Sequence, residues 1–461
     1  MSILPGLTEL TPELYLDVNK THQLTLKEST EWKIDIPTSS KLTIKIRSGI
    51  AEIFGTELAN DIEYVFTNWK ISLLAVEDVI LEWKCPDISG NKALIIQQNT
   101  TSKFVYNLHF ALDKLRTASF NGPRIMIVGD TNSGKTALCR TLCSYAIKNM
   151  PYQPLFINLN PNEGIFTPPG CLSATPISDL LEVQAQTWGQ SMTSGATVLH
   201  NKQPIVKNFG LEEVTKNKPL YLNCIDQLAK DVNERLQNDV IVQRSGCIIN
   251  TPPLSQFYDN ATNQYDSYDG LLKIIQCLNI GIVVILTNDT DEEQEKEKIN
   301  KLFDKLKSII DQNSIIRFPK LSGRFQDADD TYKRSLQRAA IREYFYGTPR
   351  TVLSPYAAGA DFDEIVIWKS MELNVNMQQD MINPFQLESV PIEANVLQHA
   401  LVAITYADRK ASSEEVSKAP ILGFGLITEV NEKRRKIWVL LPVPGRVPNK
   451  AIILTSYRYL E

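Results

Sequence analysis

The chain has little of several features that mark particular protein classes. Its 461 residues include only seven cysteines, without a C-x-x-C pair, and this odd, unpatterned count is typical of a reducing compartment. No run approaches about 18 consecutive apolar residues, so no transmembrane helix is predicted and we expect no membrane partner. The first residues, Met1–Gly6, lack the basic start and apolar core of a signal peptide, so we expect an intracellular protein.

An excess of charge of one sign is also missing. The 48 Lys and Arg residues nearly balance the 53 Asp and Glu residues, which leaves a net charge of −5. This balance excludes a general electrostatic attraction to nucleic acid or to an anionic membrane, and an RNA contact would need a local basic patch or a partner. The share of hydrophobic residues, 43%, is ordinary for a globular protein, and the length suits roughly two to four domains.

One glycine-containing motif carries chemistry. Residues 129–136 read Gly-Asp-Thr-Asn-Ser-Gly-Lys-Thr and fit the pattern G-x-x-x-x-G-K-[ST]. The apolar run 124–128 precedes the motif and predicts a buried strand, and residues 137–147 follow it with apolar residues at helical spacing. Strand, glycine loop and helix are the context that makes this pattern a phosphate-binding loop, so nucleoside triphosphate binding is predicted.

The residues of this loop have distinct expected roles. Gly129 and Gly134 allow backbone conformations that a side chain would block, so that loop N–H groups converge on phosphate oxygens at a helix N-terminus. Lys135 is expected to reach the β and γ phosphates, and the Thr136 hydroxyl is expected to hold Mg²⁺. The predicted nucleotide site comprises Gly129, Asp130, Thr131, Asn132, Ser133, Gly134, Lys135, Thr136 and Ala137.

The pattern of apolar runs predicts three domains. Residues 1–105 carry short alternating or β-branched runs between turn residues, which favours a small all-β, sandwich-like or barrel-like domain. Within 106–350, strand-like runs alternate with helical ones, and residues 351–461 read as a smaller, β-rich domain. The predicted fold class is therefore α/β, with a central P-loop NTPase-type parallel sheet flanked by an N-terminal all-β domain and a smaller β-rich C-terminal domain.

Candidate elements can be placed within this layout. The central strands are predicted at 124–128, 155–157, 247–249, 282–286 and 315–318. The central helices are predicted at 105–118, 136–148, 220–236, 266–278, 292–312 and 328–345. The N-terminal strands are predicted at 42–46, 51–54, 63–66, 71–76 and 80–83. The C-terminal strands are predicted at 364–368, 401–406, 421–428, 436–441 and 452–454.

Stretches outside the phosphate loop resemble one family. Ala51–Leu58, Ser245–Thr251 and Ile341–Gly347, together with the loop, resemble the polynucleotide 5′-hydroxyl kinase family, which includes a subunit of the pre-mRNA cleavage and polyadenylation machinery. The resemblance covers essentially the whole chain in the same three-domain order. In Gly170–Asp179 and Glu429–Lys436 the chain is most similar to the fungal branch, the ATP-binding subunit of mRNA cleavage and polyadenylation factor IA.

The resemblance implies a catalytic carboxylate that this chain lacks. Family kinases carry it at the end of the strand after the phosphate-loop helix, and Asn160 stands at that position. An amide takes up no proton at neutral pH and brings no charge to Mg²⁺. Glu163 lies three residues further on and could replace the carboxylate only if the loop were rearranged, which we do not expect. We therefore assign no catalytic residue.

Two more departures agree with the first. Active members carry a Trp, similar to a platform for an RNA base, where this chain has Leu254, and the exchange would forfeit roughly 1–3 kcal/mol of stacking. The family's lid helix is arginine-rich, but Gln337 and Ala340 fall where other members carry arginine. Lys333, Arg334 and Arg338 remain basic on this stretch. Taken alone, the stretch also suits a solvated amphipathic helix.

The resemblance also implies contacts and partners. In the similar fungal protein, the N-terminal domain brings an acidic residue and a Lys near the adenine, and the matching positions are Glu31 and Lys70. Without the resemblance, both would be read as exposed surface charges, whereas Trp32 and Trp69 are expected in the domain core. The implied partners are the scaffold subunit that binds the RNA polymerase II C-terminal tail and other 3′-end processing subunits. The resemblance leaves open whether the protein contacts pre-mRNA directly or through another subunit.

Three functional hypotheses follow. The leading one is an ATP- and Mg-binding, catalytically inactive scaffold subunit of the pre-mRNA 3′-end cleavage factor in the nucleus. The alternative is an active ATP-dependent RNA 5′-hydroxyl kinase. A third is an ATPase switch, in which hydrolysis drives a conformational change. Asn160 argues against both enzymatic hypotheses.

Overall fold

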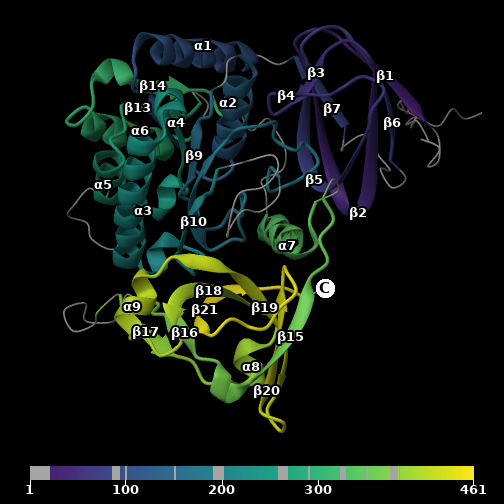
Figure 1. Ribbon diagram of the computed structural model, residues 1–461. Helices are drawn as coiled ribbons and strands as arrows, with labels where there is room; N and C mark the ends of the chain where they lie inside the picture. The colour runs from purple at the N-terminus through teal and green to yellow at the C-terminus, as the bar shows by residue number, and fades with distance from the viewer. Residues whose placement is uncertain are drawn as a thin grey trace, which may run out of the picture. The chain divides into compact units, whose positions relative to one another are not determined.

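The structure, a computed structural model, falls into two compact units, residues 1–102 and 103–461. Figure 1 colours the chain from purple at the N-terminus to yellow at the C-terminus. The described residues are 21–85, 94–98, 101–149, 152–189, 202–257, 268–288, 291–321, 329–348, 351–373, 383 and 385–460.

The first unit is a β-sandwich built around two long antiparallel strands, β2 and β5. Its strands are β1 (His22–Leu26), β2 (Thr30–Ser48), β3 (Ala51–Ile53), β4 (Thr56–Glu57), β5 (Glu63–Ala75), β6 (Val79–Lys84) and β7 (Leu94–Gln98). They form a sheet in the order β1-β6-β2-β5-β3-β4, and β7 also pairs with β2. Because the first half of β2 pairs with β7 and the second half with β6, the sheet folds over itself and encloses a core.

The long strand β5 changes its buried face midway. Along β5, the buried positions are even-numbered up to Phe66 and odd-numbered from Trp69 onward. The shift occurs at Asn68, whose φ of 48° marks a bulge, and the β2–β5 register shifts opposite it. The sequence pattern predicted two short strands here because the bulge interrupts the alternation. Trp32 and Trp69 are 0% and 7% exposed, so their expected place in the core is confirmed.

A mixed sheet forms the centre of the second unit. Its strands are β8 (Arg124–Val128), β9 (Leu155–Asn158), β10 (Cys171–Pro176), β11 (Ile205–Asn208), β12 (Cys247–Asn250), β13 (Ile282–Leu286) and β14 (Ile315–Phe318). Their order is β11-β10-β9-β12-β8-β13-β14. The five strands from β9 to β14 in this order run parallel, as predicted. The strand β10 pairs antiparallel with both β9 and β11, and the sequence analysis predicted neither β10 nor β11. The connection from β9 to β10 contains no helix that would cross the sheet, so the chain returns beside β9 in the opposite direction.

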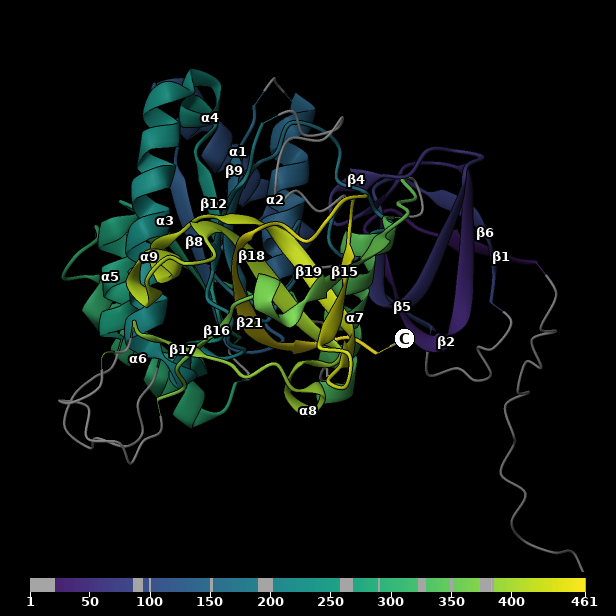
Figure 2. The ribbon, with the colours of Figure 1, turned by 60° about the horizontal axis from the view of Figure 1, so that its bottom comes forward.

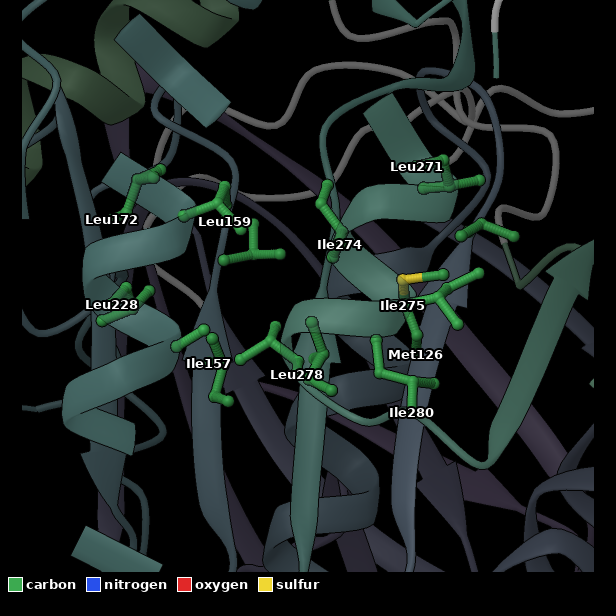
Figure 3. Packing of buried hydrophobic residues seen from close by; sticks show 14 of the residues in the cluster. Met126, Ile157, Leu159, Leu172, Leu228, Leu271, Ile274, Ile275, Leu278 and Ile280 are labelled. Atoms are coloured by element: carbon green, nitrogen blue, oxygen red, sulfur yellow. The ribbon is translucent and has the colours of Figure 1, made fainter. Parts of the chain in front are cut away.

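Helices cover both faces of this sheet (Figure 1). They are α1 (Ser102–Ala118), α2 (Lys135–Asn149), α3 (Lys218–Asn238), α4 (Val240–Ser245), α5 (Asp269–Cys277), α6 (Glu293–Leu306) and α7 (Asp330–Tyr346). Alternate strand residues divide the core, since Met126 and Ile157 pack with α3, α5 and α6, whereas Ile125 and Phe156 pack with α1 and α2. Figure 3 shows the first of these layers, in which side chains of α5 such as Ile274 meet those of the strands.

A β-rich sheet completes the second unit (Figure 2). Its elements are β15 (Tyr356–Asp361), β16 (Ile367–Ser370), β17 (Leu387–Ser389), α8 (Ala394–Leu397), β18 (Ala400–Asp408), α9 (Ser413–Lys418), β19 (Ile421–Asn431), β20 (Lys436–Leu441) and β21 (Lys450–Arg458). The strand order is β15-β20-β19-β18-β21-β16-β17. One hydrophobic cluster joins this sheet to the central part, because Tyr344 of α7 and Val206 of β11 share it with Phe424 of β19. This shared core explains why contacts do not separate the two parts.

The predicted fold class is confirmed, whereas several element bounds differ: β2 begins at Thr30 and not at 42, and the helix predicted at 292–312 ends at Leu306. The sequence analysis missed α4. The strand predicted at 364–368 begins only at Ile367, because Phe362–Glu364 forms a 3₁₀ turn with a capping box at Asp361. The domain boundaries placed after residues 105 and 350 stay predictions. In the described part of the chain, no helix is long and apolar enough to cross a membrane.

Candidate nucleotide site

The phosphate loop lies at the edge of the central sheet where the parallel strands end. It connects β8 to α2, and the neighbouring strands β9 and β12 each end in an asparagine. Gly134 has a φ of +92°, and a Cβ added there would lie 2.7 Å from Leu321 Cβ. A Cβ on Gly129 would lie 2.7 Å from Ser133 Oγ. Position 134 therefore requires glycine, as the loop motif predicts, and a side chain at position 129 would crowd the Ser133 hydroxyl.

Hydrogen bonds fix the loop from two sides. Its first carbonyl, Gly129 O, accepts from Leu254 N at 3.1 Å. On the other side, Leu321 N donates to Ser133 O at 3.1 Å. The protein itself therefore determines the conformation that would receive a phosphate.

Lys135 carries a buried positive charge. Its Nζ donates to Gly129 O at 3.1 Å and to Asp130 O at 2.7 Å, and the residue is 6% exposed. No carboxylate among the described residues forms an ion pair with it. Burial lowers the pKa of Lys135 to about 8, although the nearby charges of Glu163 and Asp130 act in the opposite direction. A buried cation that only carbonyl oxygens contact suits an anionic ligand, so the loop and the lysine fit the phosphates of a nucleotide.

The lowered pKa of Lys135 predicts that nucleotide binding depends on pH. Phosphate binding requires the charged lysine, so we expect the affinity for ATP to fall about tenfold for each pH unit above about 8. Calorimetric titrations at pH 7, 8 and 9, in two buffers with different heats of ionisation, measure the affinity and the protons taken up. We expect uptake of nearly one proton per ATP at pH 9. An affinity that stays constant to pH 9, without proton uptake, would contradict this prediction.

Two oxygen groups beside the loop suit a magnesium ion. Thr136 Oγ1 donates to Glu163 Oε2 at 2.7 Å. Mg²⁺ prefers oxygen ligands and usually combines one or two protein groups with waters and substrate phosphates. Among the described residues, no group of three or more His, Cys, Asp and Glu side chains could hold a metal on its own. The Mg²⁺ site predicted at Thr136 would therefore depend on a bound nucleotide.

The turn after β9 differs from the expectation. Asn160 is 4% exposed, and its Oδ1 accepts from Asn162 N at 3.3 Å, so its amide stabilises the turn. The same turn brings the Glu163 carboxylate to Thr136, a contact that the sequence analysis did not predict. Glu163 N donates to Asn160 O at 3.2 Å, and this bond reverses the chain within four residues. That Glu163 does not take over a catalytic role stays a prediction. The lack of a catalytic role for Asn160 stays a prediction.

The structure also locates the other two predicted departures. Leu254 is 6% exposed and packs in the core of the central part, so its side chain forms no platform beside the loop. On α7, Gln337 Nε2 donates to Asn162 O at 3.4 Å, and Ala340 is 2% exposed. A Cβ added to Gly164 would lie 2.6 Å from Ala340 Cβ. Because α7 packs this tightly against the turn, an arginine at position 340 would have no room.

The two residues predicted near the adenine belong to the first unit. Glu31 on β2 accepts a hydrogen bond from Ser72 Oγ, and its Oε2 lies 3.7 Å from Lys33 Nζ. On β5, Lys70 Nζ lies 3.4 Å from Asp35 Oδ2. The paired strands place these side chains in one polar row on a face of the sheet. Contact of Glu31 and Lys70 with a nucleotide stays a prediction.

Three family descriptions match the chain in sequence order. The N-terminal β-sandwich domain of polyadenylation factor matches residues 25–119. The mRNA cleavage and polyadenylation factor CLP1 P-loop matches residues 129–347, and the pre-mRNA cleavage complex II protein Clp1 matches residues 353–461.

Relatives of the same length agree with these matches. The mRNA cleavage and polyadenylation factors CLP1 of Vanderwaltozyma polyspora and Saccharomyces cerevisiae are 56% and 53% identical to the chain, with 100% of both chains covered in each case. A solved structure of a wild-type Clp1p–Pcf11p complex is similar with a TM-score of 0.87 and 52% identity, over 96% of this chain and 99% of that one. A second structure, equally similar, describes an extended interface between Pcf11p and Clp1p and the basis for ATP loss in a glycine-to-arginine point mutant. The chain therefore belongs to the CLP1 family of mRNA cleavage and polyadenylation factors.

Proposed function

We propose that the protein holds ATP and Mg²⁺ without turning the nucleotide over, as a scaffold subunit of the nuclear pre-mRNA 3′-end cleavage factor. The observation that carries this proposal is the preformed phosphate loop, with Lys135 buried beneath it and Thr136 beside a carboxylate. A ligand that binds only the folded state stabilises it by about 4 kcal/mol at a thousandfold excess over Kd. ATP would then serve as a structural component of the protein.

Properties of the similar Clp1p structures support the choice of ligand and partner. One of them concerns ATP loss in a point mutant, and both contain Pcf11p. We infer that this chain also binds ATP and a partner of that kind. We propose that this partner is the scaffold subunit that binds the RNA polymerase II C-terminal tail, and that other 3′-end processing subunits join the complex. Because pre-mRNA is processed in the nucleus, we propose that the protein is located there.

Three features favour a held nucleotide over turnover. Position 160 carries an amide, which the turn after β9 uses for its own hydrogen bonding. Leu254 is buried and offers no stacking surface for an RNA base. Three arginines are left on α7, and Arg334, Arg338 and Arg342 are all exposed, whereas Gln337 and Ala340 face the turn.

One incubation separates this proposal from its two rivals. The purified protein is mixed with γ-labelled ATP and an oligoribonucleotide with a 5′-hydroxyl end. We expect neither labelled RNA nor free phosphate, and we expect intact labelled ATP to remain with the protein. Labelled RNA would establish the alternative, an active ATP-dependent RNA 5′-hydroxyl kinase. Free phosphate without labelled RNA would support the ATPase switch.

The variant Asn160→Asp tests how much depends on the missing carboxylate. We expect it to restore little kinase activity in the same incubation, because the losses at Leu254 and on α7 remain. Turnover restored by Asn160→Asp alone would show that this position by itself keeps the wild-type protein inactive.

A further inference from the structure

We propose that Glu163 supplies the carboxylate of the magnesium site by orienting the Thr136 hydroxyl, in place of the carboxylate missing at position 160. The inference rests on the proposed binding of ATP and Mg²⁺, and it names the residue on which the affinity for the metal depends.

Asparagines at the ends of two neighbouring strands place Glu163. Asn158, the last residue of β9, donates from Nδ2 to Glu163 O at 3.0 Å, and its Oδ1 accepts from Asn160 N at 3.2 Å. Asn250, the last residue of β12, donates from Nδ2 to Glu163 Oε2 at 3.0 Å. One amide therefore fixes the backbone of the turn, and the other fixes the carboxylate itself. Both act at the end of the sheet where α2 begins.

The contact with Thr136 has the chemistry that a metal ligand needs. A hydroxyl that binds a cation through its oxygen must donate its proton to another acceptor. Glu163 Oε2 is such an acceptor, 2.7 Å from Thr136 Oγ1. A charged acceptor makes a stronger hydrogen bond than an amide and leaves a lone pair of the hydroxyl for the cation. Mutation of a residue that accepts a hydrogen bond from a metal ligand typically lowers the affinity for the metal by about 10–100-fold.

The amide of Asn250, which donates to Thr136 Oγ1 at 3.4 Å as well as to Glu163, has an unused acceptor. Asn250 Oδ1 is buried and accepts no hydrogen bond from the part of the chain that the structure describes. Its orientation is fixed, because Nδ2 of the same amide donates to Glu163 and, at 3.1 Å, to Asn158 Oδ1. Buried acceptors are normally satisfied, and a metal-bound water is a suitable donor.

The turn that carries Glu163 is also held from outside the central sheet. Tyr457 on β21 is 3% exposed, and its hydroxyl donates to Pro161 O at 2.9 Å. Gln337 on α7 contacts the carbonyl of Asn162. Contacts from several elements therefore position the carboxylate in advance. Without a metal, its negative charge would repel the phosphates of ATP, since like charges disfavour binding.

Release of ATP as a function of magnesium concentration tests the inference. Wild type and Glu163→Gln are loaded with labelled ATP, unlabelled ATP is added in excess, and release is followed over a range of MgCl₂ concentrations and in EDTA. In Glu163→Gln we expect the MgCl₂ concentration that half-maximally slows release to rise about 10–100-fold. In EDTA we expect the variant to release ATP no faster than wild type, because the repelling charge is gone.

Two further variants and a melting curve serve as controls. Glu388→Gln removes an equal charge from an exposed position on β17 and is expected to behave as wild type. Glu163→Asp keeps the charge on a shorter side chain and is expected to lie between wild type and Glu163→Gln. Similar melting temperatures of the ligand-free proteins show that the substitutions leave the fold intact.

Three outcomes would overturn the inference, and each has a different cause. An unchanged magnesium requirement in Glu163→Gln would leave the proposed ATP binding in place and reject the role of Glu163. Release that is faster by the same factor in MgCl₂ and in EDTA would show that Glu163 stabilises the turn and not the metal. A wild-type protein that retains no labelled ATP would reject the proposed function and this inference together.

Discussion

Replacing Lys135 by Met is expected to stabilise the ligand-free protein and to abolish its stabilisation by ATP. Burial lowers the pKa of Lys135 from 10.5 to about 8, which corresponds to a cost of about 3 kcal/mol for keeping the charge at pH 7. Methionine removes this cost and leaves no acceptor unused, since Gly129 O also accepts from Leu254 N and Asp130 O also accepts from Ser133 Oγ.

The pH dependence gives this prediction a definite sign. The pKa of Lys135 is lower in the folded protein than in the unfolded chain, so the cost is complete below about pH 8 and shrinks as the pH rises towards 10.5. The stability advantage of Lys135→Met should therefore be largest near pH 7 and small near pH 10. Urea denaturation of both proteins at the two pH values measures it, and melting with ATP and MgCl₂ measures the lost response. A variant that is less stable than wild type at pH 7, or that still melts higher with ATP, would contradict the assigned role.

Replacing Gly134 by Ala is expected to destabilise the protein and to weaken ATP binding about 100-fold, or by about 2.7 kcal/mol. The φ of +92° costs an L-residue about 1–2 kcal/mol, and the added Cβ would lie 2.7 Å from Leu321 Cβ, which overpacks the loop at a cost of about 1–3 kcal/mol. Relief requires the loop to move away from Leu321, and its N–H groups then no longer converge. Urea denaturation and calorimetric titration with ATP and MgCl₂ measure the two effects.

Gly281 offers a matched control in the same sheet. A Cβ added there meets nothing within 4 Å, and the residue directly precedes β13. Gly281→Ala is therefore expected to retain wild-type stability and ATP affinity. Equal behaviour of the two alanine variants would show that the close approach to Leu321 does not shape the loop.

The phosphate loop was predictable because its signal is local. The loop lies in one short segment, which contains a buried strand, two glycines at fixed spacing, Lys135 and a helix. Each of these parts has its own sequence pattern. The layered architecture was predictable for the same reason, because the alternation of helices and strands is also a local pattern. The core residues of β8 and β9 divide between the two faces by the period of two that strands impose.

The contact between Thr136 and Glu163 was not predictable from such patterns. It joins residues 27 apart, and it depends on a turn whose position is fixed by asparagines from two strands. The strand β10 gives no strong sequence signal. All six of its residues are buried, but Ser173, Thr175 and Pro176 among them interrupt the apolar run that marks a buried strand. The core shared by α7, β11 and the C-terminal sheet likewise arises from distant segments.

The central claim is that the folded protein holds ATP intact. The most direct test is to denature the protein after purification and to identify the released nucleotide, followed by melting of the native protein with and without added ATP and MgCl₂. We predict ATP, not ADP, close to one molecule per chain, and a lower melting temperature once the nucleotide is removed. A protein that emerges empty, with a melting temperature that added ATP and MgCl₂ leave unchanged, would contradict the account.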